Sequence, residues 1–83
     1  MNKEDLQNNN SVSLMFAFKV ALDQEDYLLC KDIKEELINR KSKGELNNEV
    51  INATVSAYDI KGADYKDMQY KVFTEMLTEI KNI

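Results

Sequence analysis

Residues 63–82 read ADYKDMQYKVFTEMLTEIKN, and this stretch decides the fold class of a chain of 83 residues. Its apolar side chains recur at alternating intervals of three and one, the spacing of a single helical face. Asp67 and Lys71 stand four residues apart with the acid first, the order that stabilises a helix. The stretch therefore predicts an amphipathic α-helix. Its face comprises Tyr65, Met68, Gln69, Val72, Phe73, Met76, Leu77 and Ile80.

Two segments before this stretch show the same period. The first, Tyr27–Lys41, is followed by Ser42-Lys43-Gly44, where basic residues and then a glycine predict the end of a helix. Glu36 and Arg40 are spaced for an exposed ion pair worth about 0.3–0.5 kcal/mol. The second segment, Leu46–Tyr58, has weaker helix propensity and depends on packing. The two apolar stripes contain Leu29, Cys30, Ile33, Leu37 and Ile38, and Leu46, Val50, Ile51, Thr54, Val55 and Tyr58.

The segment Val12–Leu22 is apolar on almost every side. A helix of this kind has to be covered on most sides, which predicts either a central helix or an oligomer interface. Ser11 stands directly before it and is the expected N-cap. Apolar residues at even positions between Val12 and Val20 leave a strand as the alternative. We expect a helix, because Leu, Met and Ala dominate the rest of the segment.

These segments together predict an all-α fold, a small antiparallel bundle of three to four helices. Residues 1–10 are polar and predict a flexible N-terminal tail, and residues 11–83 form a single helical domain. Val12 with Asp26-Tyr27, and Val50 with Asp64-Tyr65, repeat at an offset of 38 residues. If this echo is more than chance, the bundle consists of two helical hairpins.

The composition excludes several kinds of site. The chain has no His and a single Cys, so it can form neither an internal disulfide, nor a Cys/His zinc site, nor a nucleophile paired with His. Carboxylate pairs such as Glu75 and Glu79 are typical of a solvated helix surface. Cys30 lies on an apolar stripe and is expected to be a small buried residue, although Lys31 and Lys34 leave a reactive thiolate as the alternative. We predict no enzyme activity and no cofactor.

The charge and length of the segments bear on partners and location. The net charge of −4 is spread evenly, so no basic patch predicts nucleic-acid binding. Val12–Leu22 is too short to span a bilayer, and Met1–Ser11 lacks the basic region of a signal peptide. We therefore expect a cytoplasmic protein that does not bind membranes. The excess of Lys over Arg and the many Asn residues are usual in AT-rich genomes, including those of phages.

Residues 18–37, FKVALDQEDYLLCKDIKEEL, resemble the UVR motif, the helical hairpin through which the nucleotide-excision proteins UvrB and UvrC contact each other. The similarity lies in the apolar end of one helix, the Glu25-Asp26-Tyr27 turn and the charged helix after it. Cys30-Lys31 stands where the family usually has two small residues, and Lys34-Glu35 replaces the usual Arg-Asp. The resemblance implies a hairpin used for protein–protein contact, with Tyr27 sealing the elbow, and implies no repair activity.

The sequence thus predicts a small interaction module that binds and regulates another protein and forms a homo-oligomer. The surplus apolar surface of Val12–Leu22 would be covered by association. Tyr70 falls off the stripe of the last helix and is expected to be an exposed contact residue. The alternative is a binding protein for a nucleotide or metabolite between subunits, with the pairs Tyr27–Lys31 and Tyr70–Lys66. The predicted contact residues are Phe16, Lys19, Tyr27, Lys31 and Tyr70.

Overall fold

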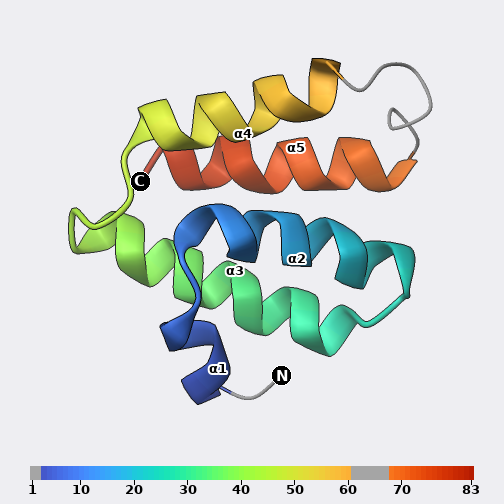
Figure 1. Cartoon of the computed structure of the whole chain (residues 1–83), viewed down its shortest axis with the longest axis horizontal. Helices are drawn as coiled ribbons and strands as arrows, with labels where there is room; N and C mark the ends of the chain where they lie inside the picture. The colour runs from blue at the N-terminus through green and yellow to red at the C-terminus, as the bar shows by residue number, and fades with distance from the viewer. Residues whose placement is uncertain (1–2, 61–67) are drawn as a thin grey trace.

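The computed structural model describes residues 3–60 and 68–83, with side chains described for residues 4–57 and 69–83. This part of the chain is helical and contains no strand, so the predicted all-α class is confirmed (Figure 1). The strand alternative for Val12–Leu22 is wrong. The helices are α1 (Lys3–Asn8), α2 (Ser11–Asp23), α3 (Tyr27–Ser42), α4 (Asn48–Ile60) and α5 (Met68–Lys81).

The four longer helices alternate in direction, as Figure 1 shows, so α2 pairs with α3 and α4 pairs with α5 in antiparallel fashion. Helix α2 contacts α3, α4 and α5. It is therefore the central helix, one of the two predicted roles of Val12–Leu22. Six of its 13 residues are buried, and the apolar ones among them belong to the core, to which α3 and α5 also contribute. The buried residues of α2 are Leu14, Met15, Phe18, Lys19, Ala21 and Leu22.

The helix boundaries follow from asparagine and aspartate caps. The Asn10 side chain accepts a hydrogen bond from the backbone N–H of Ser13 at 2.8 Å, so Asn10 caps α2 in place of the predicted Ser11. Asn10 has the extended backbone that a cap requires, whereas Ser11 is already helical. In the same way, the Asn47 side chain accepts from the N–H of Val50 at 2.9 Å. This cap moves the start of α4 beyond the predicted Leu46.

Helix α1 lies in the segment for which sequence analysis predicted a tail. Its only buried apolar side chain, Leu6, is 2% exposed and belongs to the core, and α1 packs against α3. Asn9 donates from its side chain to the carbonyl oxygen of Asp5 at 2.6 Å. A helix this short is not stable alone in water, so its contact with α3 must supply the stability. The flexibility of residues 1–10 stays a prediction.

The apolar stripe of α5 is confirmed for the residues whose side chains are described. Phe73, Met76, Leu77 and Ile80 are buried, and the rings of Phe18 and Phe73 lie with centroids 6.4 Å apart. Val72, predicted as part of the stripe, is partly exposed. The predicted residues Tyr65 and Asp67, and the Asp64-Tyr65 half of the internal echo, lie outside the described residues.

Candidate functional site

The turn between α2 and α3 presents two large apolar side chains to solvent. Leu28 is 79% exposed and Tyr27 is 63% exposed. Lys31 follows one helical turn later and is also exposed, so the three share a face at the start of α3. We call Tyr27, Leu28 and Lys31 the elbow patch. Two of its members are predicted contact residues, and the structure brings these two together.

The backbone closes this turn without help from the elbow patch. Asp26 N–H donates to the carbonyl of Ala21 at 2.9 Å and Glu25 N–H to that of Leu22 at 3.0 Å, the pair of bonds of a Schellman motif. The Asp26 carboxylate then accepts from the N–H of Leu29 at 3.3 Å and caps α3. Backbone bonds thus close the turn, and Tyr27, which was expected to seal the elbow, is instead mostly exposed.

The other three predicted contact residues lie elsewhere. Phe16 is half-buried in a groove between α2 and α4. Lys19 is 5% exposed, and its ammonium lies 2.8 Å from the carboxylate of Asp23. Tyr70 is half-buried and packs against the core, so the expectation of an exposed ring is wrong. The five residues thus belong to the elbow, the groove and the protein interior.

Cys30 lies on the buried side of α3 and faces α2. Its thiol sulfur is 3.9 Å from the carbonyl oxygen of Phe18, and the residue is buried, as the stripe predicted. Burial raises the pKa of the Cys30 thiol, and the negative charge of Asp26 raises it further. Both effects disfavour the thiolate, so this site is suited to close packing of the hairpin rather than to nucleophilic chemistry.

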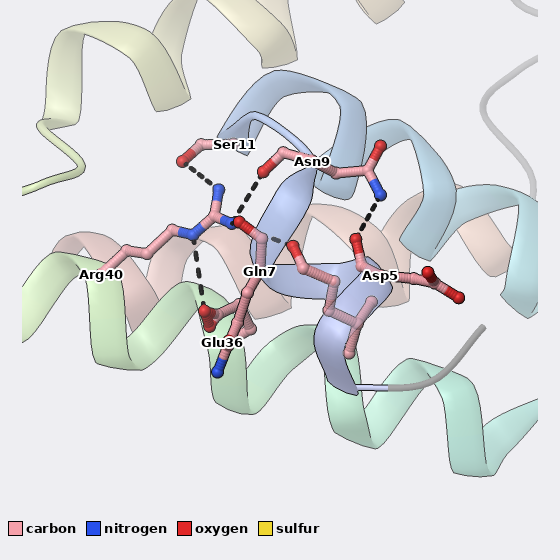
Figure 2. A network of polar contacts seen from close by, with 7 residues as sticks. Asp5, Gln7, Asn9, Ser11, Glu36 and Arg40 are labelled. Carbon is pink, nitrogen blue, oxygen red and sulfur yellow. Dashed lines mark hydrogen bonds and ion pairs between the residues drawn. The ribbon is translucent and has the colours of Figure 1, made fainter.

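Sequence analysis missed the role of Arg40, the only arginine of the chain. Figure 2 shows its guanidinium between α3 and the residues that join α1 to α2. It donates to the carbonyl oxygens of Leu6 at 3.0 Å and Asn9 at 2.7 Å, and to the Ser11 hydroxyl at 3.1 Å. A further contact of 3.4 Å reaches the carbonyl of Gln7. Arg40 thereby supplies side-chain donors to carbonyls at the end of α1 and just after it, where the Leu6 carbonyl also accepts from the N–H of Asn9 at 3.2 Å.

The predicted pairing of Arg40 with Glu36 is present, but its environment differs from the expectation. The Arg40 Nε lies 3.7 Å from a Glu36 carboxylate oxygen, and both side chains are largely buried. The signal was in the sequence, because position 40 continues the buried series 30, 33 and 37 at helical spacing. A charged residue on a buried stripe needs partners from another element, and here they come from α1.

A polar hollow of about 550 Å³ lies beside this arginine. Because the guanidinium already has protein partners, the hollow is a poor site for an anionic ligand. Of the alternative ligand pairs, Lys66 lies outside the described residues, and nucleotide binding stays a prediction that thermal-shift measurements can test. The hollow is lined by Gln7, Asn9, Asn10, Ser11, Glu36, Asn39, Arg40, Lys43 and Glu45.

Residues 3–60 and 68–83 contain no group of three or more His, Cys, Asp or Glu side chains placed to hold a metal ion. Within the same residues, each helix is too short or too polar to cross a membrane.

Comparison with known proteins found no match. No protein-family model matches the chain, no curated protein matches its sequence, and no solved structure matches its fold. The resemblance of residues 18–37 to the UVR motif therefore stays a prediction.

Proposed function

We propose that this chain is a small interaction module that binds another protein through the elbow patch and regulates it. The observation that carries the proposal is the exposure of Leu28 and Tyr27, two adjacent large apolar side chains that the turn does not need for its closure. A single exposed leucine is ordinary. An exposed aromatic beside it, on a rigid helix start, is typical of the anchors at protein interfaces.

The packing of the hairpin supports this role. Ala21 on α2 and Cys30 on α3 are both buried, and the thiol of Cys30 touches the backbone of α2. The two helices therefore approach closely even though Cys30-Lys31 replaces the small pair of the UVR motif. A closely packed hairpin holds the elbow patch in one geometry, which lowers the entropic cost of binding.

The chemistry of the patch indicates what the partner offers. Tyr27 and Leu28 need an apolar pocket, and Lys31 can pair with an acidic group at its rim. Regulation would follow if that pocket is one that the partner needs for its own activity. The proposed cytoplasmic location and the phage origin of the chain rest on the sequence alone.

Self-association also belongs to the proposal, on changed grounds. Helix α2 is covered by α3, α4 and α5, so its apolar character no longer requires a second copy. What remains on α2 is the partial exposure of Val12 and Val20. An oligomer would therefore need a particular exposed apolar face of the molecule.

Affinity capture with matched variants tests the elbow patch. The bait proteins are the wild type, Leu28→Glu and Asn52→Glu, which adds the same charge at an exposed position of α4. We expect the wild type and Asn52→Glu to retain the same partner and Leu28→Glu to lose it, by mass spectrometry and then by titration with the purified partner. Equal retention by Leu28→Glu would exclude the elbow patch, and no specific partner for the wild type would exclude the function.

A further inference from the structure

A second apolar feature lies away from the elbow patch, between α2 and α4. It is an open groove of about 280 Å³, and Val12 at its edge is 40% exposed. Phe16, one of the predicted contact residues, lies half-buried in it. Neither helix needs an open groove for its own stability. The groove is lined by Val12, Phe16, Val50, Ala53, Thr54 and Ala57.

The described residues that line the groove carry no charge, in a chain of which 31% of the residues are charged. The two longest uncharged runs of the sequence are residues 6–18 and 50–58, and the groove is built from these two runs. By contrast, α3 exposes Lys31 and Glu35, and α5 exposes Lys71, Glu75 and Glu79. Depletion of charge is the compositional mark of the core of a protein interface.

Among the described residues, the lining of the groove also offers no unpaired polar side chain to a ligand. Thr54 is the one polar residue among the six that line it, and its hydroxyl donates to the carbonyl oxygen of Val50 at 3.0 Å. A nucleotide or another polar metabolite would therefore lose hydrogen bonds to water without replacing them. The occupant that fits is the apolar surface of another protein.

We propose that this occupant is a second copy of the chain, packed groove to groove about a two-fold axis. The proposal rests on the self-association included in the proposed function and names the face that carries it. Two copies with a net charge of −4 each repel one another. An uncharged face is where they can approach with the least opposition, and an isologous pair brings the same uncharged face from both sides.

The size of the face sets the strength of the dimer. Helices α2 and α4 have 13 residues each and are therefore about 20 Å long. With helix axes about 10 Å apart, the two together present about 400 Å² per copy. A total of about 800 Å² is below the roughly 1,200–2,000 Å² of stable specific interfaces and lies in the range of weak, transient ones. The dimer is therefore weak and depends on concentration.

Sedimentation equilibrium across a concentration series tests the proposal with two variants. Ala53→Glu places a charge in the groove, and Asn52→Glu places the same charge next to it in sequence, at an exposed position outside the groove lining. We expect a dimer for the wild type and Asn52→Glu, and a dissociation constant at least about tenfold higher for Ala53→Glu. Circular dichroism shows whether both variants keep the helical fold, since both positions are exposed.

The salt dependence gives a second readout. Added salt screens the repulsion between two acidic copies, so the groove dimer is expected to tighten as salt rises, whereas a dimer held by ion pairs would loosen. A wild type that stays monomeric up to about 1 mM overturns the proposal. So does a dimer unchanged in Ala53→Glu. A dimer lost in Leu28→Glu but kept in Ala53→Glu would assign self-association to the elbow patch. If the wild type is monomeric and binds a different protein that Ala53→Glu no longer binds, the groove is the site for that protein.

Discussion

The turns before and after α3 share one backbone pattern, but the side chains around them differ. Before α3, the N–H of Asp26 donates to the carbonyl of Ala21 at 2.9 Å, and after α3, the N–H of Glu45 donates to that of Arg40 at 2.8 Å. Each turn has one residue in the left-handed region, Glu25 with φ of 58° and Gly44 with φ of 77°. Both are Schellman motifs, so their differences come from the side chains.

The C-terminal end of α3 is stabilised by its backbone, its apolar side chains and Arg40. Gly44 suits left-handed backbone, Leu37 and Leu46 are buried on either side of the turn, and Arg40 binds the end of α1. The N-terminal end has Glu25, a residue with a Cβ, in the left-handed region and leaves Leu28 in solvent. The C-terminal end is thus held by contacts within the fold, whereas the N-terminal end has the exposed side chains that we propose for a contact outside the chain.

The largest expected effect is that of Arg40→Ala. The substitution leaves Glu36 without its cation, removes the arginine donor from the carbonyl of Asn9, and leaves the carbonyl of Leu6 with only the N–H of Asn9. Breaking a buried charged network costs about 3 kcal/mol of unfolding free energy. Urea denaturation measures this, with Lys43→Ala at an exposed position as the control. A loss no larger than that of Lys43→Ala would show that Arg40 does not anchor the fold.

The same variant tests the N-terminal segment. In the wild type, hydrogen exchange of the amides in α1 should be slowed by the contacts of Leu6 and Arg40 with the rest of the protein. In Arg40→Ala this protection should be lost while α5 keeps its own. Fast exchange of α1 already in the wild type would support the flexible tail that the sequence predicts.

Gly44→Ala comes next in size and isolates the backbone at the C-terminal end. A Cβ at Gly44 meets no atom within 4 Å, so a clash does not contribute to the cost. The left-handed conformation alone costs a residue with a Cβ about 1–2 kcal/mol. We expect a loss of unfolding free energy of about 1 kcal/mol in urea denaturation. A neutral result would show that the left-handed position contributes little to either turn.

The sequence predicted what depends on local pattern. The stripe of Cys30, Ile33 and Leu37 and the stop at Gly44 are confirmed, because helical spacing and the backbone freedom of glycine act within a few residues. Helix α1 was not predicted, because six residues have too little propensity to form a helix without tertiary contacts. Apart from Glu36, the partners of Arg40 lie 29–34 residues away in the sequence, so only the fold reveals them.

The candidate site was predicted in part for the same reason. Tyr27 and Lys31 share a helix face, and their spacing alone places them together. Tyr70 also lies off the apolar stripe, yet it packs against the core, because the neighbouring helices decide which face of α5 is covered. The groove that holds Phe16 joins two segments about 40 residues apart, and no local pattern predicts that they pack side by side.

Glu25→Gly is the matched reverse of Gly44→Ala. Glycine removes the strain of a Cβ in left-handed backbone but adds freedom to the unfolded chain, so the net stabilisation is about 0.5–1 kcal/mol. The two substitutions should shift the denaturation midpoint in opposite directions, and their effects should add in the double variant because the sites share no partner. A destabilised Glu25→Gly would mean that the Glu25 side chain contributes to the elbow of the isolated protein.

The smallest expected effect on stability is that of Leu28→Glu. This variant tests whether the N-terminal end of α3 serves binding while the C-terminal end serves stability. Because Leu28 is 79% exposed, the unfolding free energy should change by less than about 0.5 kcal/mol. A carboxylate in the first turn of α3 even lies favourably at the positive end of the helix. Denaturation should therefore hardly distinguish this variant from the wild type, while partner binding is lost. A large destabilisation would instead show that Leu28 is covered within the protein in solution. The elbow patch would then stabilise the fold, as the C-terminal end of α3 does.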